Sequence, residues 1–155
     1  MITIGIDPGL SGAIACVSDE GVIALHDMPV MPYGRGAYVK NAVDLTAVAR
    51  LLSARGPAVV WLERVGSMPG QGVASMFSLG MSYYGVAGVA IGLGIPVNLV
   101  MPADWKGDMG LGRDKGESLA LARKLHPNLD LSRKKDHGRA EALLIARYGQ
   151  KRRMH

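Results

Sequence analysis

The sequence predicts a single α/β domain in which a mixed five-stranded sheet is flanked by helices. Its 155 residues suit one such domain, and a hydrophobic content of 48% supplies a core. Apolar periodicity predicts three consecutive strands followed by alternating helices and strands. We expect one domain over residues 1–150 and a solvated basic tail over residues 151–155.

The first part of the chain is predicted to be mostly strands. Residues 2–6 form an apolar run that ends at the turn signal Asp7-Pro8-Gly9, and residues 12–18 and 22–27 form two more strands. The short turns between them favour an antiparallel meander. Residues 28–41 combine Pro, Gly and basic residues without periodicity, so we expect a mobile loop there.

The remainder of the chain predicts alternating helices and strands. Asp44 is a candidate cap for a helix over residues 45–54, and the apolar run 58–62 is typical of a buried strand that ends at Glu63. We then expect a long helix over 73–93, a strand over 95–101, an irregular stretch over 102–112, and helices over 114–125 and 136–148. This order is that of the RNase H-like fold, an open sheet with its site at strand ends.

Charge and composition narrow the class of partner. A net charge of +5 favours polyanions, with nucleic acid first and an anionic membrane surface second. Cys16 is the single cysteine, which fits a reducing cytoplasm, and Asp7 interrupts any signal peptide. Residues 79–101 are uncharged and long enough to span a bilayer, but Pro96 and Asn98 favour a buried helix followed by a strand, so we expect no membrane partner.

Two carboxylates stand at the ends of apolar strands. A nuclease that uses two divalent cations needs several carboxylates that converge from different elements. Asp7 and Glu63 meet this requirement if their strands are neighbours. Taken singly, Asp7 also fits a turn aspartate bonded to its own backbone, and Glu63 fits a solvent-exposed partner of Arg64. The pair is the stronger signal.

A third group of candidate ligands lies at the start of the last helix. His137 and Glu141 are four residues apart and therefore share one helical face. Asp136 precedes them, where the alternative role is an N-cap. The alternative for His137 and Glu141 is an ordinary exposed pair. The apolar run that follows favours a ligand role for Glu141.

These motifs together resemble the RuvC family of Holliday junction resolvases over nearly the whole chain. The matching segments, in family order, are Gly5-Ile6-Asp7-Pro8-Gly9, Leu62-Glu63-Arg64-Val65, Ser78-Leu79-Gly80, Pro102-Ala103-Asp104-Trp105-Lys106, Gly110-Leu111-Gly112 and Ala140-Glu141-Ala142-Leu143-Leu144. The resemblance implies an RNase H-like homodimer that cuts four-way or other branched DNA with Mg²⁺, for which Mn²⁺ substitutes. The short length resembles bacteriophage-type members, whose site of action is the cytoplasm of a bacterial host.

The chain departs from the family pattern at three places, one of which is a looser match over residues 28–41. Gly138 stands three residues before Glu141, where the family carries a ligand, so the fourth ligand is either Asp136 or His137. The family often has an aromatic residue shortly after the second acid, but residues 66–71 have none. Met68 is the candidate to take its place against a DNA base, with Gln71 as a further DNA contact in the same loop.

Basic residues are the remaining DNA-binding candidates. By resemblance, Lys106 and Lys115 lie near the scissile phosphate or along the DNA path, where cations neutralise phosphates. The basic run before the last helix, which is also expected to meet DNA, consists of Arg133, Lys134 and Lys135. The alternative for each is an ordinary surface cation.

Other functions remain open at this point. The same fold serves nucleases of flaps, forks or RNA–DNA hybrids, and a binding module with an inactive site is a second class. An actin-like ATP-binding protein or sugar kinase also begins with an aspartate near a glycine turn, but that fold duplicates the domain and needs more chain. The nearly all-apolar helix over residues 73–93 is either internal or meets a partner, and a two-fold homodimer is the preferred interpretation.

Overall fold

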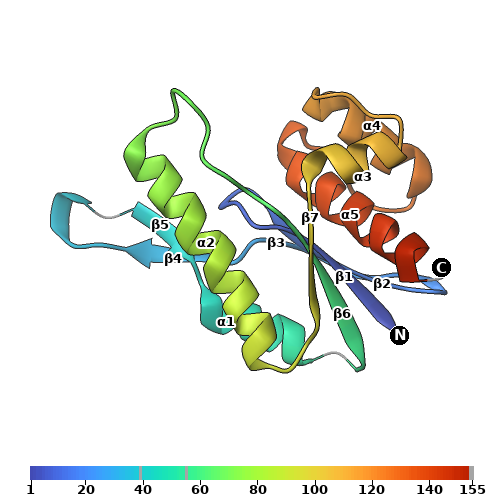
Figure 1. Ribbon diagram of the computed structural model, residues 1–155, viewed down its shortest axis with the longest axis horizontal. Helices are drawn as coiled ribbons and strands as arrows, with labels where there is room; N and C mark the ends of the chain where they lie inside the picture. The colour runs from blue at the N-terminus through green and yellow to red at the C-terminus, as the bar shows by residue number, and fades with distance from the viewer. Residues whose placement is uncertain (39, 55, 154–155) are drawn as a thin grey trace.

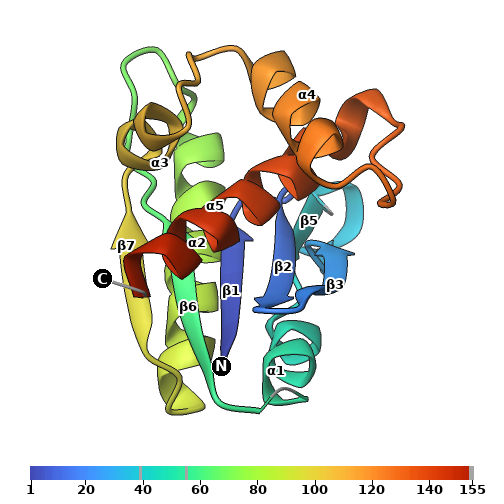
Figure 2. The same cartoon turned by 90° about the vertical axis from the view of Figure 1, so that its right-hand side faces the viewer.

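A five-stranded mixed sheet forms the centre of the protein in the computed structural model, which describes residues 1–38, 40–54 and 56–153. Its strands run in the order β3-β2-β1-β6-β7 (Figure 2). Their bounds are β1 Ile2–Asp7, β2 Ala13–Ser18, β3 Gly21–Asp27, β6 Ala58–Glu63 and β7 Val97–Val100. The first three strands pair antiparallel, whereas β1, β6 and β7 are parallel neighbours. The predicted mixed α/β sheet is confirmed.

The architecture is more elaborate than a simple meander with two added strands. The pairing of β2 with β3 shifts register between Cys16 and Val17. A separate two-stranded sheet, β4 (Val30–Tyr33) and β5 (Lys40–Val43), extends to one side of the molecule (Figure 1). The prediction of a loop over residues 28–41 is therefore wrong. Pro32 weakened the strand signal. Proline is tolerated here because both strands of a two-stranded ribbon are edge strands, where a residue without a backbone N–H need not break the pairing.

Helices cover both faces of the sheet. On one face lie α1 (Leu45–Ser53) and α2 (Val73–Gly92); on the other lie α3 (Pro102–Asp108), α4 (Lys115–Leu125) and α5 (His137–Arg153), with α5 crossing the strands diagonally (Figure 2). Asp44 caps α1 as predicted, since its Oδ1 accepts from Ala47 N at 2.9 Å. Two short 3₁₀ turns, Gly36–Tyr38 and Lys134–Asp136, complete the described elements.

Alternation along the central strands decides which residues meet which layer. Ile4 and Ile6 of β1 are buried in the cluster beneath α1 and α2. The alternate residues Thr3, Gly5 and Asp7 therefore face α5. At Gly5 the approach is so close that a Cβ atom would collide with the backbone of Ala142 and Ala146, which is why a residue without a side chain stands there.

Two predictions for the C-terminal half are wrong: a helix was missed, and the last helix is longer than expected. The stretch expected to be irregular contains α3, whose first residue, Pro102, suits the first turn of a helix. The last helix continues past residue 150 to Arg153, and Lys151 Nζ lies 2.7 Å from Asp108 Oδ2. Arg153 also donates to Met1 O at 2.8 Å. The part of the predicted basic tail up to residue 153 is thus helical, and the rest lies outside the described residues.

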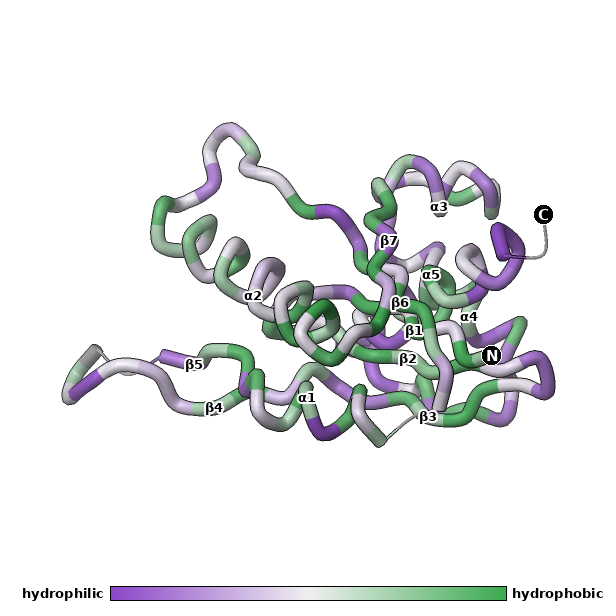
Figure 3. The backbone as a smooth tube through the Cα atoms, turned by 60° about the horizontal axis from the view of Figure 1, so that its bottom comes forward, coloured by the Kyte–Doolittle hydropathy of each residue, from purple (hydrophilic) through white to green (hydrophobic). Residues whose placement is uncertain are grey.

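Helix α2 is apolar on more than its buried side. Within the part of the chain that the structure describes, it is the one helix long and apolar enough to cross a membrane, and its tube in Figure 3 is pale to green. Ser82, Tyr83, Val86, Ala87 and Ala90 are buried against the rest of the domain. An outer stripe of apolar residues is exposed: Val73, Phe77, Tyr84 and Ile91. The helix is therefore not wholly internal.

Candidate metal and nucleic-acid site

One open cleft lies at the carboxyl ends of β1 and β6, where the start of α5 meets them. Asp7, Glu63, His137 and Glu141 all line it, so the structure brings four of the five predicted ligands together. Pairing of the parallel strands explains the first two, because Ile6 lies opposite Leu62 and the next residue on each strand is the acid. Alternation turns both acids toward α5, as with Gly5.

The start of α5 is pressed against the turn that follows β1. A Cβ atom on Gly138 would collide with the backbone carbonyl of Ser11 and come within 3.0 Å of Gly12 Cα. No ligand side chain fits at this position, which explains the departure from the family pattern. His137 and Glu141, one residue before and three after it, line the cleft instead.

Two of the acids are costly to ionise where they lie. Burial, followed by the negative charge of Glu141, raises the pKa of Asp7 to about 6. Burial, followed by the charge of Asp7, raises the pKa of Glu63 to about 7. Mutual repulsion between nearby carboxylates is relieved when a cation binds between them.

Glu141 has one oxygen that lacks a hydrogen-bond donor. Lys106 Nζ lies 3.1 Å from Glu141 Oε1 and forms an ion pair with it. The geometry of that contact is not that of a hydrogen bond, and the buried Oε1 atom has no other donor. A buried carboxylate oxygen in this condition is a natural ligand for a cation.

A contact between Nδ1 and the main chain orients the imidazole ring of His137. Its Nδ1 lies 3.3 Å from the carbonyl oxygen of Lys134, and a carbonyl only accepts, so Nδ1 carries the proton in this contact. In the neutral ring Nε2 is then the nitrogen with a free lone pair. Metal-binding histidines usually have this arrangement, in which the distal nitrogen donates to a carbonyl or carboxylate.

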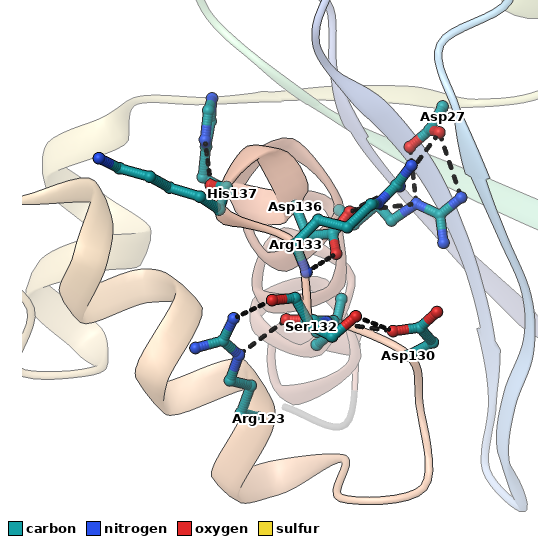
Figure 4. Close-up of polar contacts among 10 residues, drawn as sticks. Asp27, Arg123, Asp130, Ser132, Arg133, Asp136 and His137 are labelled. Atoms are coloured by element: carbon teal, nitrogen blue, oxygen red, sulfur yellow. Dashed lines mark hydrogen bonds and ion pairs between the residues drawn. The ribbon is translucent and has the colours of Figure 1, made fainter.

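Asp136 does not line the cleft. Its side chain is buried beside Arg133, whose backbone N–H donates to Oδ2 at 2.8 Å and whose Nη2 lies 2.6 Å from Oδ1. Burial alone would raise the pKa of Asp136, but the hydrogen bonds from Arg133 outweigh it and hold the pKa below its usual value. In Figure 4, His137 points away from the cluster that Asp136 forms with Arg133 and Asp27. The predicted alternative, an N-cap of the last helix, is not observed: Asp136 is the third residue of the 3₁₀ turn before α5, and its carboxylate accepts from Arg133. His137 is therefore the better candidate for the fourth ligand.

The predicted DNA contacts divide into two groups. Lys106, Lys115, Met68 and Gln71 line the cleft. Arg133 is instead held by Asp136 and by Asp27, with 3.4 Å between Nη2 and Asp27 Oδ2. Lys134 and Lys135 are exposed outside the residues that line the cleft.

Trp105 is a residue of the site that the sequence did not indicate. Its indole Nε1 donates to Glu63 Oε1 at 2.9 Å. Trp105 does lie next to Lys106 in a segment that resembles the RuvC family. Because that segment was expected to be irregular, the sequence did not place the Trp105 side chain near Glu63.

The ligand types fit a hard divalent cation. Within the described ranges, no three His, Cys, Asp or Glu side chains form a ready-made metal cage. Mg²⁺ does not need one, because it usually binds one or two carboxylates and keeps several waters, with substrate phosphates completing its shell. Glu141 Oε1 is buried and has an ion pair with Lys106 but no hydrogen-bond donor. This oxygen and the raised pKa values of Asp7 and Glu63 fit the binding of such a cation.

The sheet order, the helix α5 on the α3–α4 face and the strand-end acids define an RNase H-like α/β fold with an acidic cleft. Among solved structures, Thermus thermophilus RuvC in complex with a Holliday junction substrate superimposes with a TM-score of 0.64 at 16% identity, covering 97% of this chain and 96% of that one. A second Thermus thermophilus RuvC structure gives a TM-score of 0.57 at 19% identity, with the same coverage. These likenesses show that the chain has the RuvC fold.

One curated protein is similar in sequence. It is the chloroplastic Holliday junction resolvase MOC1 of Chlamydomonas reinhardtii, 42% identical over 83 residues, which cover 51% of this chain. The match spans only 9% of the length of that relative. No family model matches the chain.

Proposed function

We propose that this protein is a metal-dependent, structure-selective endonuclease that cuts branched DNA as a Holliday junction resolvase. The observation that carries the proposal is the convergence of Asp7, Glu63, His137 and Glu141 on one cleft that also contains Lys106 and Lys115. The junction as substrate is supported by the sequence similarity to a resolvase and the fold similarity to a RuvC that holds a junction.

Each side chain in the cleft has a role that follows from its position. Asp7, Glu63 and Glu141 would hold Mg²⁺, or Mn²⁺ in its place, and His137 would add its Nε2. The bound metal supplies Lewis-acid activation of the attacking water and stabilisation of the leaving oxygen. Lys106 and Lys115 neutralise the phosphates that enter the cleft, and the exposed Met68 in the adjoining loop contacts bases.

The protein acts as a two-fold homodimer in this proposal. A four-way junction has two symmetric strands to cut, which calls for two sites related by a two-fold axis. The exposed apolar stripe of α2 supports the dimer, because Val73 and Tyr84 are 80% and 76% exposed and apolar surface of this kind marks contact sites. We also propose that the chain belongs to the bacteriophage-type resolvases and works in the cytoplasm.

A panel of DNA substrates tests the function. Purified protein with Mg²⁺ or Mn²⁺ is given an end-labelled four-way junction, a linear duplex, a flap and an RNA–DNA hybrid, beside an Asp7→Asn variant. We expect paired symmetric nicks in the junction that the variant does not make. Equal cutting of flaps or hybrids would support a broader nuclease of the same fold. Tight junction binding without cutting in either metal would indicate a binding module and overturn the proposal.

A further inference from the structure

We propose that Trp105 is a positioning residue for Glu63, whose carboxylate it orients for metal binding through the indole N–H. The proposal rests on the function proposed above. The indole Nε1 donates to Glu63 Oε1 at 2.9 Å, and this is a hydrogen bond between two buried side chains that are 42 residues apart in sequence. It leaves Oε2 as the oxygen of Glu63 that the indole does not engage, so a cation in the cleft has a defined oxygen to bind.

The donor is held in place by the core. Trp105 is 0% exposed and belongs to the hydrophobic cluster between the sheet and α5, which also contains Val100, Leu119 and Leu143. A ring that is packed on all sides does not rotate away without opening the core. The direction of its N–H is therefore set by the fold, and the rotamer of Glu63 is set in turn. Groups of this type fix the orientation of metal ligands in other proteins.

Helix α3 connects two acids of the cleft through consecutive residues. Trp105 binds Glu63, and Lys106 forms the ion pair with Glu141 at 3.1 Å. Lys106 Nζ also lies 5.1 Å from the centroid of the Trp105 ring, within cation–π range. The indole thus contacts both the acid of β6 and the cation that accompanies the acid of α5. A change at Trp105 is expected to alter the site even where the fold is intact.

The chain contains its own control, because Trp61 is the only other tryptophan. Trp61 packs edge-on against Tyr148, with ring centroids 5.5 Å apart, and its Nε1 has no hydrogen-bond partner. Replacing either indole by benzothienylalanine exchanges the N–H group for sulfur and nearly preserves the ring shape. At position 105 the exchange removes the hydrogen bond to Glu63, whereas at position 61 it removes none.

The experiment measures metal affinity as well as cutting. Mg²⁺ and Mn²⁺ are titrated by calorimetry into the wild type of 155 residues and into the two single analogue proteins, and thermal unfolding checks that all three fold. We expect the metal Kd of the position-105 analogue to rise roughly 10- to 100-fold, with cutting partly restored at high metal concentration. The position-61 analogue is expected to match the wild type.

The outcomes separate this proposal from the one on which it depends. Wild-type affinity in the folded position-105 analogue overturns the positioning role and leaves the nuclease proposal standing. Absence of metal binding by the wild type overturns the nuclease proposal, and the positioning role with it. As a second readout, Trp105 is the only indole in a Trp61→Phe protein, and its emission is expected to change as Mg²⁺ binds. Constant emission during metal binding that calorimetry detects would count against the contact.

Discussion

Arg133 and Asp136 form a hydrogen-bonded ion pair just before α5. The backbone N–H of Arg133 donates to one carboxylate oxygen of Asp136 at 2.8 Å, and its side-chain Nε donates to the other at 2.8 Å. Arg133 and Arg139 both reach Asp27 at the end of β3, so the pair ties the helix start to the sheet. We therefore expect this acid, which the sequence offered as a metal ligand, to have a structural role.

Replacing Asp136 by Asn is expected to lower stability without changing the metal site. The loss is about 2 kcal/mol in the free energy of unfolding at neutral pH, because buried charged hydrogen bonds are weakened. The pKa of Asp136 is lowered in the folded protein, so this stabilisation is present above the unfolded-state pKa and lost as the pH falls through the folded one. Urea unfolding at neutral and acid pH measures both effects.

The control is Asp130→Asn, which changes an exposed turn aspartate whose Oδ1 accepts hydrogen bonds from the backbone N–H and the hydroxyl of Ser132. We expect it to cost much less than Asp136→Asn. A drop in Mg²⁺ affinity for folded Asp136→Asn would contradict the structural role and restore Asp136 as a ligand.

Asp7 is expected to destabilise the metal-free protein at neutral pH. Its pKa is raised from 3.8 to about 6, so the folded state binds the proton more tightly than the unfolded chain does. Stability relative to an Asp7→Asn variant then falls as the pH rises from about 4 to about 6. The variant should be the more stable protein at pH ~8, by roughly 3 kcal/mol. Unfolding in the presence of a chelator measures the difference, and equal pH profiles would show that Asp7 is not buried among negative charges.

Metal is expected to reverse that order. A ligand that binds only the folded state stabilises it by about 4.1 kcal/mol at 1,000 times its Kd. Mg²⁺ should therefore raise the unfolding midpoint of the wild type, and much less that of Asp7→Asn or Glu141→Gln. Thermal unfolding with and without Mg²⁺ tests this, with NaCl at equal ionic strength as the control. An equal gain in all three proteins would indicate a metal site elsewhere.

Lys115 and Arg133 are expected to differ in DNA binding. Lys115 lines the cleft, whereas Arg133 is occupied by two carboxylates. Lys115→Gln should weaken junction binding and reduce the slope of log affinity against log salt by about 1. Arg133→Gln should leave that slope unchanged and lower stability. Binding is measured in a chelator over a series of salt concentrations, and a reduced slope for Arg133→Gln would show that its ion pairs open for DNA.

The sequence predicted the elements whose pattern is local. The apolar runs that end at Asp7 and Glu63 identified two central strands and both acids, because strand length and an acid at a strand end are visible without the fold. The i, i+4 spacing likewise placed His137 and Glu141 on one face. Each of these predictions depends only on short-range regularity.

Features that depend on long-range contacts were missed or left open. The choice between Asp136 and His137 depends on Arg133 and on Asp27, which is 109 positions before Asp136 by residue number. The glycine at position 138 reflects contact with the turn after β1, which no local pattern reveals. The β4–β5 ribbon was hidden by Pro32. Helix α3 was hidden by its short length and by Gly107, Gly110 and Gly112 at and after its end, although it carries Trp105 and Lys106.

Cuts in an end-labelled four-way junction, made by the wild type, Glu141→Gln and Asp136→Asn in Mg²⁺ with protein in excess, can be mapped to test which acids the cleft uses. We expect paired nicks by the wild type and by folded Asp136→Asn at similar rates, and a loss of roughly 10²-fold or more for Glu141→Gln. The opposite order, with Glu141→Gln active and Asp136→Asn inactive, would contradict the assignment of the cleft as the site of cutting.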